Sequence, residues 1–112
     1  MGKPNVKTII KAWGEEEIIV NESEYGAKYI IVKRGGQSSI HYHLKKKESF
    51  YWLNGDAVIR LYSEDGKLTC SLFLSVDTPG PHTIKPGMRH SFKGITHAII
   101  LEISTHDDPD DC

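Results

Sequence analysis

Three histidines and one glutamate have the types and the spacing of ligands for a metal ion. His41 and His43 stand two positions apart, and such positions point to the same face of an extended strand. Glu48 begins the next apolar run, which a hairpin can bring back beside them, and His90 follows far downstream. Imidazole and carboxylate groups together suit Zn, Fe, Mn, Ni or Co. The four side chains therefore predict one divalent metal ion with room for water or a substrate.

The elements that must position these ligands are predicted to be short strands, because apolar residues recur with a period of two. The predicted strands are Lys7–Lys11, Glu17–Asn21, Lys28–Lys33, Ser38–His43, Ser49–Leu53, Ala57–Tyr62, Leu68–Ser75, His82–Lys85, Arg89–Lys93 and Ala98–Ile103. The strongest hairpin signal is Asn54-Gly55, because both residues tolerate positive φ. No segment has a convincing helical period. The pattern predicts an all-β sandwich or closed barrel.

Size and composition are typical of one small globular domain. The chain has 112 residues, of which 38% are hydrophobic and 26% charged. No domain boundary is visible, so residues 1–112 are expected to form a single domain with an acidic tail over residues 106–112. We expect homodimers, because the N-terminal strands within residues 1–21 could add to the sheet of a partner.

Charge and apolar patterning exclude several kinds of partner. The net charge is −1, from 14 basic and 15 acidic residues, and this balance predicts no nucleic-acid partner. No apolar run approaches the roughly 20 residues that span a bilayer, so no membrane partner is expected. The first residues do not form a secretory signal, which predicts a cytoplasmic protein. Cys70 and Cys112 are accordingly interpreted as reduced thiols.

The spacing of the candidate ligands resembles the two conserved motifs of the cupin family. The first motif is matched at every fixed position, and the second has adjacent Pro and Gly residues where the family usually separates them. It also has Gly94 where the family commonly has Asn. The matching residues are Gly35, His41, His43, Glu48 and Gly55 in the first motif, and Gly80, Pro86, Gly87 and His90 in the second. The resemblance covers nearly the whole chain. It implies a single cupin-type double-stranded β-helix, or jelly-roll barrel, with the four ligands already named.

A narrower resemblance is to sugar-handling cupins, in particular the mannose-6-phosphate isomerase type II domain. It rests on Trp13-Gly14-Glu15-Glu16, on Tyr25 with Lys28, on residues 39–48, and on residues 102–108. That domain often has Gln where this chain has His41, and the additional imidazole favours metal binding here. The resemblance implies a metal-dependent sugar or sugar-phosphate isomerase or epimerase. Its metal would bind the sugar oxygens and stabilise developing negative charge while a base moves a proton.

Three further charged residues are candidates for catalysis. Glu102 interrupts an apolar strand, and burial there would raise its pKa towards that of a useful base. Lys28 and Arg89 could hold an anionic or hydroxylated substrate. The simpler alternatives are a surface position or salt bridge for Glu102, an exposed strand position for Lys28 and a rim position for Arg89. The run Lys45–Lys47 is most simply a solvated loop.

Two other functions compete with the isomerase. An iron-dependent dioxygenase could use the same ligands, although it would favour a drier and more aromatic pocket. A non-catalytic cupin that binds a small ligand would need no inward acid or base. Lys28, Arg89 and Glu102 favour the isomerase, because an isomerase needs several polar groups that face its substrate.

Overall fold

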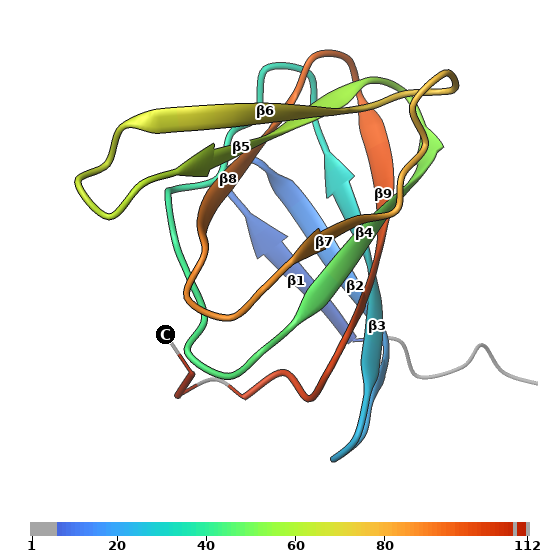
Figure 1. Ribbon diagram of the computed structural model, residues 1–112. Coiled ribbons are helices and arrows are strands. Elements are labelled where there is room, and N and C mark those ends of the chain that lie inside the picture. The colour runs from blue at the N-terminus through green and yellow to red at the C-terminus, as the bar shows by residue number, and fades with distance from the viewer. Residues whose placement is uncertain (1–6, 109, 112) are drawn as a thin grey trace, which may run out of the picture.

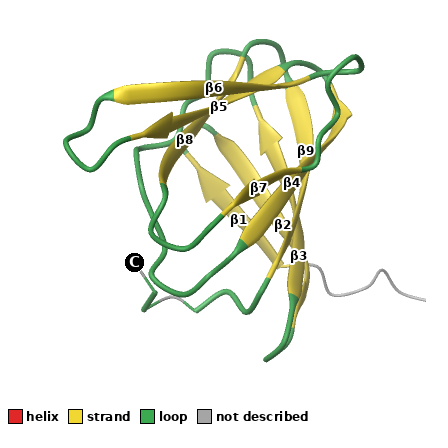
Figure 2. Cartoon of the chain, in the orientation of Figure 1, coloured by secondary structure: helices red, strands yellow, loops and turns green. Residues whose placement is uncertain are grey.

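The computed structural model describes residues 7–108 and 110–111, and these residues form nine strands. The strands are β1 (Lys7–Lys11), β2 (Gly14–Asn21), β3 (Gly26–Val32), β4 (Glu48–Asn54), β5 (Ala57–Tyr62), β6 (Leu68–Leu74), β7 (His82–Ile84), β8 (Arg89–Gly94) and β9 (Ala98–Ser104). Figure 2 shows strands and loops, and no helix, along the described part of the chain. The all-β expectation is therefore confirmed. No helix that could cross a membrane occurs within the described ranges.

The strands are arranged in two antiparallel sheets that face each other (Figure 1). The larger sheet has the order β1-β2-β3-β9-β4-β7, and the smaller has the order β6-β5-β8. The turn between β4 and β5 carries the chain from the larger sheet to the smaller one. Strands with one apolar side can bury that side only against a second layer, so this pairing of sheets follows from the period of two.

A turn forms at Asn54-Gly55 as predicted, but β4 and β5 do not pair with each other and lie in different sheets, so the predicted hairpin is wrong. Gly55 has a φ of 75°, a conformation in which a side chain is strained. A Cβ atom at this position would also lie 2.1 Å from the carbonyl oxygen of His97. Glycine is therefore required here both by the turn and by the close approach of the neighbouring loop.

One predicted strand is absent, and another begins earlier than predicted. The segment Ser38–His43 is not a strand: it makes one isolated bridge, from His41 to His90, and the preceding residue Gln37 makes another, to Lys93. Between the two bridges the chain advances four residues, from Gln37 to His41, whereas β8 advances only three, from His90 to Lys93. The one extra residue breaks the regular alternation of side chains that a strand requires. The second strand begins at Gly14 and not at Glu17, because Glu15 and Glu16 pair with both β1 and β3.

The interior is apolar at one end and polar at the other. The apolar core consists of Ile30, Val32, Phe50, Ala57, Ile59, Leu74, Ile84, Phe92, Ala98 and Ile100. Buried charged residues are concentrated on the same inner faces towards the opposite end, where β4 begins and β9 ends. Cys70 is a free, exposed thiol, and Cys112 lies outside the described residues. The polar end of the interior is where the predicted ligands lie.

Candidate metal centre

The three candidate imidazoles are brought together by the bridge between the segment before β4 and strand β8. His41 and His90 exchange backbone hydrogen bonds of 2.9 Å in both directions. The ring centres of His41 and His43 lie 5.5 Å apart, those of His41 and His90 lie 4.3 Å apart, and those of His43 and His90 lie 6.2 Å apart. With metal–nitrogen bonds of about 2.0–2.1 Å, rings that share one ion lie within about 6.5 Å of each other. The spacing of the rings thus suits a shared ion.

Each of the three imidazoles uses its Nδ1 atom in a hydrogen bond to a backbone carbonyl. The distances are 3.0 Å from His41 to Ser39, 3.0 Å from His43 to Asp111 and 3.0 Å from His90 to Met88. A carbonyl oxygen only accepts, so Nδ1 carries the hydrogen and Nε2 of the neutral ring presents a lone pair. This is the arrangement that metal-binding histidines adopt. Burial lowers the pKa of His41, the bond to Ser39 opposes this shift, and His90 reinforces it.

The contact between Glu48 and His90 is the observation that best tests whether a cation fits. Oε1 of Glu48 lies 2.8 Å from Nε2 of His90, and both side chains are buried. Neither atom has a hydrogen-bond partner among the described residues. With Nδ1 of His90 protonated, these two atoms present lone pairs to each other, and a cation or a proton between them is needed to make the contact favourable.

The four side chains do not form a closed coordination sphere as they stand. Within the described ranges, no group of three or more His, Cys, Asp or Glu side chains is arranged so that it could hold an ion without adjustment. Two donors on one ion lie about 3 Å apart when each metal bond is about 2.1 Å long. Glu48 and His90 approach that separation, whereas His41 and His43, which are partly exposed, would have to turn towards them.

Lys46 lies in the interior beside this site and not in a solvated loop. It was expected in a solvated loop, but it is only 3% exposed. Its Nζ atom lies 3.1 Å from Glu48, 3.3 Å from Glu102 and 3.4 Å from Asp107. The only available signal was its position two residues before Glu48, which puts both on one side of an extended chain. Burial would lower the pKa of Lys46, but the three carboxylates outweigh that effect and raise it.

Glu102 and Lys28 are both buried and lie opposite each other on β9 and β3. Burial, and then the charge of Glu48, raise the pKa of Glu102 to about 7, although Lys28 and Lys46 oppose the shift. Lys28 lies 3.2 Å from Glu16, 3.3 Å from Asp107 and 3.9 Å from Glu102. Its charge is thus compensated within the protein.

Glu48 keeps its negative charge in this environment. Burial alone would raise the pKa of Glu48, but with a proton on Nε2 of His90 the hydrogen bond from that ring and the charge of Lys46 outweigh burial and lower the pKa to about 2. Together with Glu16, Glu102 and Asp107, Glu48 makes a group of four carboxylates around the two lysines Lys28 and Lys46. The four carboxylates outnumber the two lysines, so the region next to the three imidazoles lacks positive charge.

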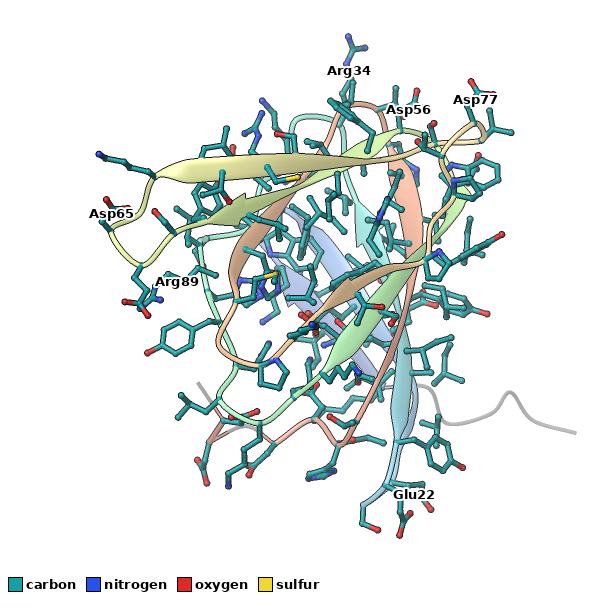
Figure 3. All side chains as sticks on the ribbon, viewed as in Figure 1. Glu22, Arg34, Asp56, Asp65, Asp77 and Arg89 are labelled. Carbon is teal, nitrogen blue, oxygen red and sulfur yellow. The ribbon has the colours of Figure 1, made fainter. Side chains whose placement is uncertain are left out.

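Arg89 is not brought into this interior group. Its guanidinium lies 4.6 Å from the centre of the Tyr42 ring, in a cation–π contact. Figure 3 shows Arg89 on the outside of the barrel, on the left in this view. Neighbouring residues of a strand point to opposite faces, so the buried position of His90 directs Arg89 outwards.

Comparison with solved structures identifies the fold. The chain superposes on an RmlC-like cupin from Shewanella frigidimarina with a TM-score of 0.74 and 16% identity, over 95% of this chain and 88% of that protein. The chain has the cupin fold. A scan against family models and a search of curated proteins found no match to this chain.

Two other solved cupin-fold structures are larger than this chain. The capsular polysaccharide assembling protein CapF from Staphylococcus aureus gives a TM-score of 0.79 at 19% identity, over 96% of this chain and 31% of CapF. Oxalate decarboxylase from Bacillus subtilis, whose Mn(II) centres have been studied, gives 0.68 at 18% identity, over 94% of this chain and 28% of the enzyme. The chain spans about a third of the length of either protein.

Proposed function

We propose that this cupin binds one divalent first-row metal ion through His41, His43, Glu48 and His90. The observation that carries the proposal is the 2.8 Å contact between Glu48 Oε1 and His90 Nε2, two buried atoms with no hydrogen-bond partner among the described residues. A cation shared with His41 and His43 would satisfy both atoms. It would also supply positive charge to the surrounding group of carboxylates, which is otherwise incompletely balanced.

We further propose that the reaction is the isomerisation or epimerisation of a small sugar or sugar phosphate. A divalent ion at this site would supply a Lewis acid for the carbonyl and hydroxyl oxygens of the sugar. Glu102 is the proposed proton acceptor, because it is buried beside the site and its pKa of about 7 suits acid–base chemistry near neutral pH. The likeness to CapF, a capsular polysaccharide assembling protein, supports a carbohydrate ligand at the level of the fold.

The ion pairs of Lys28 and Lys46 bear on whether the substrate is a free sugar or a sugar phosphate. Lys28 and Lys46 are each held by three carboxylates, so neither offers an uncompensated charge to a phosphate group. Arg89, the third cation considered for this role, lies outside the barrel over Tyr42. We therefore expect free sugars to be better substrates than the corresponding sugar phosphates.

The test combines metal analysis with a substrate panel. Protein purified without added metal is analysed for its elements and then assayed for isomerisation of free aldoses and aldose phosphates. We expect about one equivalent of metal and turnover that a chelator abolishes. Glu48→Gln should lose both, whereas the control His82→Gln should keep both, because the His82 ring hydrogen-bonds the backbone carbonyl of Phe73 and is not one of the candidate ligands. Oxygen consumption without isomerisation would instead support a dioxygenase, and metal without turnover would support a binding protein.

A further inference from the structure

The C-terminal segment, residues 105–108 and 110–111, returns to the loop that carries the candidate ligands. Asp111 is 3% exposed, and its carboxylate accepts three consecutive backbone N–H groups. The distances are 2.9 Å from Leu44, 2.8 Å from Lys45 and 2.8 Å from Lys46. Three amides that converge on one carboxylate fix the backbone of the loop between His43 and Glu48.

Asp111 also contacts a candidate ligand directly. Its backbone carbonyl accepts the Nδ1–H of His43 at 3.0 Å. One residue thus holds the loop through its side chain and sets the tautomer of His43 through its main chain. Because Nδ1 keeps the hydrogen, Nε2 of His43 is left with a lone pair for an ion.

Two more contacts tie the same segment to the same loop. Thr105 exchanges hydrogen bonds with Lys47: its N–H donates to the carbonyl of Lys47 at 3.0 Å, and its Oγ1 accepts the N–H of Lys47 at 3.1 Å. Asp107 lies 3.4 Å from the ammonium group of Lys46. The segment is therefore anchored at its beginning, at its middle and at Asp111. Figure 1 shows that it runs along the end of the barrel where the loop between His43 and Glu48 lies.

We infer that Asp111 is a positioning residue for metal binding, which holds His43 and the loop after it in the arrangement that the ion requires. This inference rests on the metal site proposed above. Without the Asp111 carboxylate, the amides of residues 44–46 lose their shared acceptor and the segment loses its last anchor. His43 would then be free to change its tautomer and its ring orientation. Loss of such a supporting partner typically weakens metal binding about 10- to 100-fold.

The experiment compares Asp111→Ala and Asp111→Asn with Asp110→Asn, a matched control at an exposed neighbouring position. Co²⁺ affinity is measured by titration. The tautomer of His43 is measured in the metal-free proteins from the ¹⁵N shifts of its ring. We expect Co²⁺ to bind Asp111→Ala about 10- to 100-fold more weakly, with His43 a mixture of tautomers. Asp111→Asn, which keeps an acceptor oxygen and the shape of the side chain, should lie between Asp111→Ala and the wild type. Asp110→Asn should match the wild type in both measurements.

The two readouts separate this inference from the proposed metal site. If the wild type binds Co²⁺ and both Asp111 variants bind it equally well with an unchanged His43 tautomer, the role of Asp111 is wrong and the metal site stands. If the wild type does not bind Co²⁺, the metal site and the role of Asp111 in it are both wrong. If the amide spectrum shows that Asp111→Ala is unfolded, the same comparison is made with Asp111→Asn alone, whose side chain has nearly the same shape as that of the wild type.

Discussion

The ammonium group of Lys46 lies 3.1 Å from the carboxylate of Glu48, and both side chains are almost fully buried. The same ammonium also contacts Glu102. A buried charge of this kind is tolerated only while it is paired, since its partners replace the water it has lost. Lys46 therefore joins the candidate ligand Glu48 to the candidate base Glu102, and removing it should affect more than one contact.

Replacing Lys46 by Met should destabilise the protein strongly. Met has a similar length but no charge, so Glu48 and Glu102 would be left in the interior without their common cation. Breaking a buried ion pair in this way typically costs about 3–5 kcal/mol. Urea unfolding measures the effect, and the matched control is Lys45→Met, whose side chain is exposed. Equal stability of the two variants would show that Lys46 is not paired in the interior.

Metal should stabilise the protein in a manner that depends on the imidazoles. An ion that binds only the folded state at a concentration 100 times its Kd adds about 2.7 kcal/mol to the free energy of unfolding. We expect Co²⁺ to raise the unfolding midpoint of the wild type and of His82→Ala, but not that of His43→Ala. A rise that persists in His43→Ala would contradict the proposed ligand set.

Glu102 should make stability fall as the pH rises towards neutrality. Its pKa is about 7 in the folded protein, above the ordinary value of 4.5, so between these values the folded state holds a proton that the unfolded state has released. Each rise in pH across this window therefore favours unfolding. The difference in unfolding free energy between wild type and Glu102→Gln, measured by urea at several pH values in the presence of chelator, should decline from about pH 4.5 to about pH 7. A flat difference would show that the pKa of Glu102 is not raised.

We propose that the expected homodimer forms through β1. Among the described residues, β1 is an edge strand of the larger sheet, and Ile10 on it is 76% exposed. An open edge with an exposed apolar side chain is suited to pairing with a second copy. Ile10→Asp should weaken self-association at least about tenfold in sedimentation equilibrium. The reason is that burying an Ile side chain in the interface contributes roughly 1.5–3 kcal/mol, which the variant would lose. The control Ile95→Asp changes an exposed loop residue and should have no effect. If both variants associate like the wild type, the dimer does not use β1.

The sequence was sufficient to predict the strands whose alternation is regular. Asn54-Gly55 marked the turn between β4 and β5 correctly, because a turn with positive φ has few possible residues. The pairing of these two strands was predicted wrongly, since they lie in different sheets. The segment Ser38–His43 was wrongly predicted as a strand. Its extra residue opposite β8 interrupts the pairing, and the amino-acid sequence of the segment gives no sign of that residue. His41 and His43 nevertheless come close to each other, since the bridge to His90 holds the segment in place.

The surroundings of the candidate ligands were harder to predict than the ligands themselves. Lys46 lies in a run of three lysines, which usually indicates a solvated loop, and its burial depends on the distant acids Glu102 and Asp107. Asp111 was placed in an acidic tail, and nothing local distinguishes it from Asp110. Both roles arise from contacts between residues far apart in the chain, which a local pattern does not record.

The hydrogen bond between His43 and Asp111 spans 68 residues of the chain. The contact that orients His43 therefore exists only in chains that reach residue 111. We expect chains cut before Asp111 to take up the ion more weakly, although all four candidate ligands would still be present in them.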